Sequence, residues 1–319
     1  MVPPQLPVQP QPSLKPSNAN GVSGEILWQW RQQAIASIPE TDPRSLADLS
    51  QELDWLLLEV SDLTPLDLRL KPVVTQTVQL WVTLEQLEQL WQRRLQEQVP
   101  VQHLTGTAHW RQFHLRVSKD VLIPRPETEL LIDLAVAATQ PSSACKSMDQ
   151  WADLGTGSGA ISLGLATAFP QAIIHAVDCS ELALAIAAEN AQAYQVQDRM
   201  CWHLGQWCEP LVGLEGQLTG IVSNPPYIPT ETLPTLQPEV VDHEPHLALD
   251  GGGDGLDAIR EIVAIAPQYL QSGGVLLLEM MCGQDRAVEA LLAAQGQYTQ
   301  IQIHADLAGI LRFAQAYRI

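Results

Sequence analysis

From Trp151 to the end of the chain, strand-like and helix-like segments follow one another in alternation, an order that few folds accommodate. Short apolar runs alternate with stretches in which apolar residues recur at helical spacing. Such alternation favours a mainly parallel sheet with helices on both faces, so we predict a doubly wound α/β domain. The segments are residues 172–177, 182–193, 221–223, 258–269, 274–279 and 287–294.

The earlier part of the chain has helical spacing throughout. Ser45 followed three residues later by Asp48 is typical of a helix start. Leu84, Leu87 and Trp91 belong to a later apolar stripe with the same period. A stripe of this kind is usually the core of a bundle, so it predicts a helical domain without indicating what that domain binds.

These patterns divide the chain into four parts. Residues 1–23 are rich in Pro, Gln, Ser and Asn and are predicted to form a flexible tail. Residues 24–106 are predicted to form the helical N-terminal domain. Apolar and polar residues alternate within residues 107–125, which predicts a β-hairpin linker. Residues 126–319 are predicted to form the α/β domain.

Charge and cysteine usage disfavour several functions. The formal charge is −19, and residues 121–319 hold only 7 basic residues against 23 acidic ones. Nucleic-acid binders need clustered Lys and Arg, so direct binding of nucleic acid is not expected. The five cysteines form no CxxC pair, which predicts neither a metal site nor a disulfide framework. Without a secretory leader or a long apolar stretch, the protein is expected to be cytoplasmic and to have no membrane partner.

A glycine-rich turn stands between the first predicted strand of the α/β domain and the helix after it. Glycines let the backbone approach a ligand closely, although such turns also occur for structural reasons alone. The GxGxG spacing differs from the GxGxxG of dinucleotide sites and from the phosphate loop, which needs a lysine. The turn contains Gly155, Thr156, Gly157, Ser158 and Gly159.

The next predicted strand ends in Asp178. A carboxylate at this position can accept hydrogen bonds from ribose hydroxyls. An isolated Asp there can also be a turn residue or the cap of the following helix. The glycine turn and Asp178 together indicate a cofactor that contains adenosine.

A second motif, Asn224-Pro225-Pro226-Tyr227, follows the predicted strand 221–223. The prolines end the strand and fix the backbone at the sheet edge where ligands bind in such folds. The Asn224 side-chain oxygen and the Pro225 carbonyl could accept both hydrogens of an amide or amino group. Tyr227 could pack on its planar group. Such a clamp would turn a poorly nucleophilic nitrogen toward an electrophile.

Acidic residues after this motif are interpreted as a solvated loop and not as paired catalytic carboxylates. They include Glu244, Asp250 and Asp254. Attack by an amide nitrogen on an electrophile needs no strong base, because the product proton can leave to water. Cys179, beside Asp178, is interpreted as a small packed residue.

With these motifs in place, the chain resembles the release-factor glutamine methyltransferases. The likeness is collinear from about residue 100 to residue 312. Its most specific parts are VLIPRPETE at 121–129, DLGTGSGAI at 153–161 and SNPPYI at 223–228. The resemblance implies a seven-stranded, Rossmann-like class I methyltransferase domain that follows a small helical domain and a hairpin linker. It also implies transfer of a methyl group from S-adenosyl-L-methionine to glutamine in the Gly-Gly-Gln motif of class 1 peptide chain release factors.

The family's site residues can be carried over by position. Residues 155–159 would cradle the methionine end of the cofactor, Asp178 would hold the ribose and Trp207 would pack near the adenine. Asn224, Pro225, Pro226 and Tyr227 would grip the glutamine, with Asn224 also beside the cofactor. Arg125 and Glu127 would lie close to the cofactor, and the helical domain would help to dock the release factor.

This chain departs from the family pattern at Gln206 and Thr219, where Asp is usual, and at Met281, where Gly is usual. With these substitutions, the family pattern does not specify which residues of this chain contact the adenine and the substrate. Three alternative functions also remain at this point: methylation of a glutamine in a ribosomal protein, methylation of adenine in DNA, and cofactor binding without catalysis.

Overall fold

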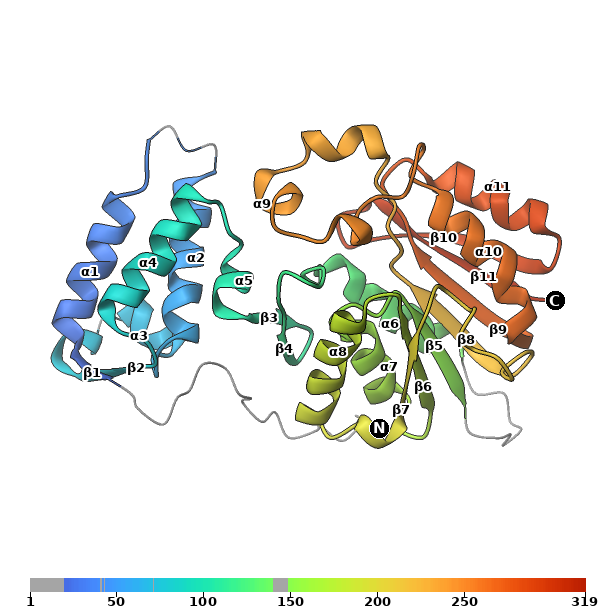
Figure 1. Cartoon of the computed structure of the whole chain (residues 1–319), viewed down its shortest axis with the longest axis horizontal. Helices are drawn as coiled ribbons and strands as arrows, with labels where there is room; N and C mark the ends of the chain where they lie inside the picture. Colours follow the sequence, from blue (N-terminus) through green and yellow to red (C-terminus); the bar gives the residue numbers. More distant parts are fainter. Residues whose placement is uncertain (1–19, 41, 43, 71, 140–148) are drawn as a thin grey trace. The chain divides into compact units, whose positions relative to one another are not determined.

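The computed structural model describes residues 20–40, 42, 44–70, 72–139 and 149–319. The described chain forms two compact units, which divide between Thr107 and Ala108. Both are drawn in Figure 1, and each is described by itself. No helix of the described ranges has the length and apolarity needed to cross a lipid bilayer.

The smaller unit is mainly helical, as its apolar spacing predicts. At the start of α2, the Ser45 hydroxyl accepts a hydrogen bond from the Asp48 amide at 3.0 Å, so the predicted cap is confirmed. Leu87 and Trp91 of the predicted stripe are fully buried. The helices are α1 (Gly24–Ala36), α2 (Leu46–Glu59), α3 (Pro65–Leu70), η1 (Pro72–Thr75), α4 (Leu84–Gln96) and α5 (Val101–Thr105).

One part of the predicted tail is instead a strand. β1 (Asn20–Ser23) pairs antiparallel with β2 (Thr77–Leu80), residue for residue. Pairing satisfies backbone groups and needs no apolar side chains, which explains why the composition of residues 1–23 did not reveal it. The rest of that segment, residues 1–19, lies outside the described residues.

The larger unit contains a seven-stranded sheet in the order β10-β11-β9-β8-β5-β6-β7. Strands β5 to β9 are mutually parallel, whereas β11 runs antiparallel to both β9 and β10. The prediction of a doubly wound, mainly parallel sheet is confirmed. The strands are β5 (Gln150–Leu154), β6 (Ile173–Asp178), β7 (Met200–Leu204), β8 (Leu218–Ser223), β9 (Leu270–Glu279), β10 (Tyr298–Ala305) and β11 (Leu311–Arg318).

Helices cover both faces of this sheet (Figure 1). Alternate residues of β9 face opposite sides, so Leu277 packs with α6, α7 and α8 while Leu276 packs with α10 and α11. The helices are η2 (Glu127–Glu129), α6 (Leu130–Ala138), α7 (Ala160–Ala168), α8 (Glu181–Ala193), η3 (Gln197–Arg199), η4 (Thr230–Thr235), α9 (Pro238–Val241), η5 (His246–Ala248), α10 (Asp257–Tyr269) and α11 (Asp285–Gln295).

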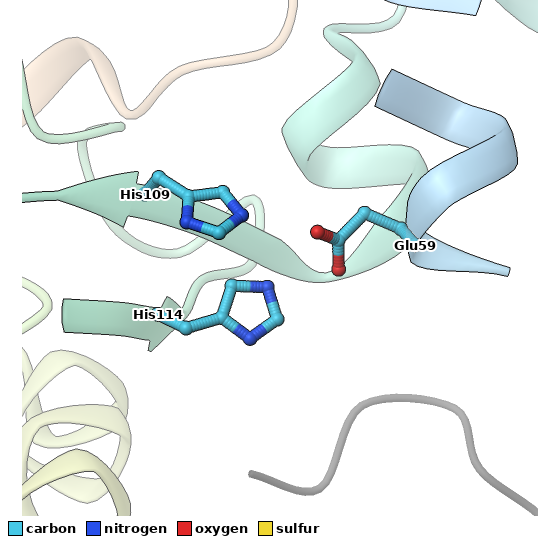
Figure 2. A group of neighbouring side chains, drawn as sticks. All are labelled: Glu59, His109 and His114. Carbon is cyan, nitrogen blue, oxygen red and sulfur yellow. The ribbon is translucent and has the colours of Figure 1, made fainter. Parts of the chain in front are cut away.

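The predicted hairpin forms from β3 (Thr107–Trp110) and β4 (Phe113–Arg116). Its apolar side chains, including Trp110 and Phe113, are buried in the same core as α6 and α7. The hairpin begins at the boundary between the two units, and from Ala108 onward it is part of the larger one. Figure 2 shows His109 and His114 on the neighbouring strands. Their ring centroids are 4.5 Å apart.

Candidate cofactor and substrate site

A cavity of about 560 Å³ opens at the carboxyl ends of the parallel strands. Its volume lies within the range of small-molecule sites, and this edge is where open α/β sheets bind ligands. The turns after four neighbouring strands meet there. Predicted site residues that line the cavity are Gly155, Gly157, Asp178, Trp207, Asn224 and Pro226.

The glycine turn follows β5, an inner strand that lies between β8 and β6 in the sheet. Gly157 has φ +53°, a conformation that favours glycine, and its amide donates to Asp178 Oδ2 at 2.9 Å. No atom lies within 4 Å of the place where a Cβ would stand on Gly157. The turn therefore presents bare backbone, as a close approach by a ligand requires.

Other residues of the turn face the protein interior. The Thr156 hydroxyl donates to Asp153 Oδ2 at 2.7 Å, and the Ser158 carbonyl accepts from Asn190. A Cβ on Gly159 would lie only 3.0 Å from the Ala187 Cβ, so this glycine allows α7 and α8 to pack closely. None of these three lines the cavity. They shape the turn, and their predicted contact with a cofactor stays a prediction.

Asp178 ends β6 and lines the cavity. Its two carboxylate oxygens accept backbone hydrogen bonds from Gly157 and Ser180, each at 2.9 Å. The cap of α8 is Ser180, whose hydroxyl accepts from the Ala183 amide, so Asp178 is not needed for capping. Burial raises the pKa of Asp178 above the usual value. The interpretation of Cys179 as a packed residue is wrong, because its side chain is exposed at the cavity wall.

The amide of Asn224 is held by a polar network behind the cavity. Its Nδ2 donates to Thr128 Oγ1 at 3.3 Å, and the buried Thr128 in turn hydrogen-bonds to Glu279. The Tyr227 hydroxyl donates to Glu279 Oε1 at 3.2 Å. Because Nδ2 faces the protein, Asn224 Oδ1 remains available as an acceptor for a ligand. Pro225 and Tyr227 do not line the cavity, so their predicted contacts with substrate stay predictions.

The comparisons with known proteins agree with this geometry. Residues 133–253 match the methyltransferase small domain family. A protein named release factor glutamine methyltransferase from Synechocystis sp. is 51% identical over 94% of this chain and 98% of its own length. A second protein of that name, from Thermosynechococcus vestitus, is 49% identical over 92% of this chain and 99% of its own length.

The chain belongs to the release factor glutamine methyltransferase family. It is a methyltransferase with the class I fold, so the resemblance found in the sequence is confirmed. Among solved structures, that of the hMettl16 catalytic domain in complex with MAT2A 3′UTR hairpin 6 has a TM-score of 0.50 at 12% identity. It covers 87% of this chain and 93% of that one, and it supports the fold alone.

This methyltransferase contains an ion pair between a partly exposed arginine and a buried carboxylate that the sequence did not reveal. Arg125 Nη2 donates to both oxygens of Glu244, at 2.7 and 2.8 Å, and the Glu244 side chain is only 2% exposed. The interpretation of Glu244 as part of a solvated loop is therefore wrong. Burial raises its pKa, and the charge of Arg125 opposes that rise. Neither Arg125 nor Glu127 lines the cavity, but Pro245 beside Glu244 does.

Removing Arg125 is expected to destabilise the fold more than neutralising its partner. In Arg125→Met the buried Glu244 carboxylate loses its counter-charge, whereas Glu244→Gln leaves Arg125 able to reach solvent. We expect Arg125→Met to lower the free energy of unfolding by about 2–3 kcal/mol and Glu244→Gln by less, since Arg125 is partly exposed. Urea unfolding at pH 8 measures both, and the double variant gives the coupling. If both single variants lose the same free energy of unfolding and the double variant shows no coupling, Arg125 and Glu244 do not stabilise the fold as an ion pair.

The site also contains residues that sequence reasoning missed. Thr128 stands in the VLIPRPETE segment, which contributes to the family resemblance without giving Thr128 a role, and Glu279 ends the apolar strand β9. An acidic residue at the end of such a strand is an unusual choice, because its charge must be buried. That signal could have identified Glu279, which is 1% exposed.

Two of the departures from the family pattern lie away from the cavity wall. Thr219 is near the start of β8, and its hydroxyl accepts from the Gln150 amide at 3.3 Å, at the opposite end of the strand from Asn224. The Met281 amide donates to Gln284 Oε1. The third departure, Gln206, lines the cavity.

Glu279 makes the fold sensitive to pH near neutrality. Burial raises the pKa of this carboxyl from 4.5 to about 7. The folded state thus favours the neutral acid, so wild type loses stability as the pH rises from about 4.5 through 7. Glu279→Gln is expected to be more stable than wild type at pH 8, by as much as about 3 kcal/mol, and similar to it at pH 4.5. Chemical denaturation at both pH values measures this. A difference that does not depend on pH would exclude titration of Glu279 as the cause.

Proposed function

We propose that this protein transfers a methyl group from S-adenosyl-L-methionine to the side-chain amide nitrogen of glutamine in the Gly-Gly-Gln motif of class 1 peptide chain release factors. The observation that carries the proposal is the placement of the Asn224 acceptor in one cavity with the glycine turn and Asp178. The names of relatives up to 51% identical support the choice of release factor. The reaction would take place in the cytoplasm, with translation.

The cavity wall suits this cofactor. Five acidic residues line it and, among its described lining residues, there is no Lys or Arg. Such a wall favours a cationic ligand and disfavours a phosphate backbone, which speaks against methylation of DNA. The bare backbone at Gly157 leaves room for the methionine end of the cofactor to pass close by. The carboxylate of Asp178 can accept from ribose hydroxyls, and the Trp207 indole offers an aromatic surface for adenine. The acidic residues are Asp120, Asp178, Asp250, Asp257 and Glu261.

When bound, S-adenosyl-L-methionine supplies a methyl group that is electrophilic because the sulfur is positively charged. The protein's part is to orient the nucleophile. An amide nitrogen is a poor nucleophile, because its lone pair is delocalised into the carbonyl. Asn224 Oδ1 and the Pro225 carbonyl accept its two hydrogens and direct the lone pair toward the methyl group, and the surplus proton leaves to water. Positioning of this kind can contribute up to about 7–11 kcal/mol.

The test is methyl transfer from labelled S-adenosyl-L-methionine to a purified class 1 release factor. A Gln→Asn change in the factor's Gly-Gly-Gln loop is the control. Label on the unaltered factor alone would establish reaction, substrate and position together. If the protein binds cofactor in the same preparation but labels neither form, the release factor is not the substrate. Ribosomal proteins would then be tested in the same assay.

A further inference from the structure

Glu261 connects helix α10 to the cavity. It lies in the first half of that helix, is exposed and lines the cavity wall. Two donors from the turn after β7 converge on it. Gln206 Nε2 donates to Glu261 Oε2 at 2.9 Å, and Trp207 Nε1 donates to the same oxygen at 2.7 Å.

The two hydrogen bonds fix the orientation of the carboxylate. Because both end on Oε2, the acceptor lone pairs of Oε1 are left for a ligand. Trp207 itself is held in an unusual conformation, with φ +46°, which few non-glycine residues adopt. A backbone of this kind persists when its surroundings determine it, and sites that clamp a ligand are common places for it.

The position of Glu261 matches the adenine end of the proposed cofactor. A Cβ on Gly155 would lie 3.8 Å from Trp207 Cζ3, so the indole stands directly beside the glycine turn. β6 and β7 are paired so that Asp178 is opposite Leu204, and the turn with Trp207 begins at the next residue. With the ribose on Asp178, a flat base would extend toward Trp207 and Glu261.

On the basis of the proposed function, we propose that Glu261 determines specificity for the base by accepting the exocyclic 6-amino group of adenine on Oε1. The Gln206 side chain in the turn after β7 is an amide that donates to Glu261, so the carboxylate at this end of the cavity comes from helix α10. A carboxylate accepts from an amino group but repels a carbonyl oxygen, so the site would reject a 6-oxo base.

The test compares S-adenosylhomocysteine with S-inosylhomocysteine, in which a 6-oxo group replaces the 6-amino group. Isothermal titration with the full chain measures both affinities. We expect wild type to prefer the adenine ligand by about tenfold to hundredfold, as for a hydrogen bond to a charged group. Glu261→Gln should reduce this ratio to near one, because an amide can accept from one base and donate to the other. Glu289→Gln removes a charge from the exposed face of α11 and should leave the ratio unchanged.

A second variant separates base recognition from a general loss of structure. Gln206→Asp added to Glu261→Gln places a carboxylate in the turn beside the same cavity wall and should restore the preference for adenine. If Glu261→Gln keeps the wild-type ratio, Glu261 does not recognise the base and the inference is overturned. If wild type binds S-adenosylhomocysteine no better than buffer controls, the cofactor proposal fails, and the role of Glu261 fails with it.

Discussion

Replacement of Asn224 by alanine is expected to lower kcat for methyl transfer by about 10²- to 10³-fold while cofactor affinity changes little. The side chain's proposed task is to hold the substrate amide, and its own amide nitrogen is already bound to Thr128. Alanine removes the acceptor and keeps the backbone of the proline turn. The nitrogen lone pair then loses its orientation, so the chemical step slows while the cofactor half of the cavity stays intact.

Single-turnover labelling of the release factor gives the rate, and titration with S-adenosylhomocysteine gives the affinity. Thr128→Ser and Thr128→Val form a matched pair of control variants. Serine keeps the hydroxyl that accepts from Asn224 and should retain most of the rate, whereas valine should slow the reaction because Asn224 can then rotate. Loss of cofactor binding together with turnover in Asn224→Ala would refute this division of roles.

The predicted residues that line the cavity are those whose signal is local. The order of strands and helices follows from short periodic runs. Asp178 ends one strand of the parallel sheet, and Asn224 directly follows another. Because the carboxyl ends of such strands share one edge, their meeting in one cavity could be predicted without coordinates. Gly157 also lines the cavity, as expected for a glycine in a turn between strand and helix, where the backbone can approach a ligand closely.

The residues that were missed depend on partners far away in the chain. Thr128 and Asn224 are 96 positions apart, and Arg125 and Glu244 are 119 apart. Periodicity in the sequence does not reveal such distant pairs, which is why it predicts Glu244 to be a solvated acid. Similarly, Gly159 is predicted as part of the cofactor turn, although the need for glycine there comes from its φ of +82° and from the neighbouring helix α8.

Replacement of Asp178 by alanine is expected to weaken cofactor binding by about 10²- to 10³-fold, because hydrogen bonds from ribose hydroxyls to a charged acceptor are lost. The Gly157 amide also loses its partner, which loosens the turn. Binding should depend on pH as well. Burial raises the pKa of Asp178, so the neutral acid, a poorer acceptor, forms at a higher pH than for an ordinary Asp. Wild-type affinity should therefore fall as the solution becomes mildly acidic.

Titration with the cofactor at a series of pH values measures this fall in affinity. Asp178→Asn should lack the fall, because its amide does not ionise. Asp250→Asn is the matched control, since it removes an equal charge from the same cavity wall. Asp250 is bound by the Thr230 hydroxyl, which holds its pKa below the usual value, so it stays charged in mild acid. A ribose contact at Asp178 predicts a large loss in Asp178→Asn and a small one in Asp250→Asn. Equal losses would mean that the wall attracts the cationic cofactor only through its total charge.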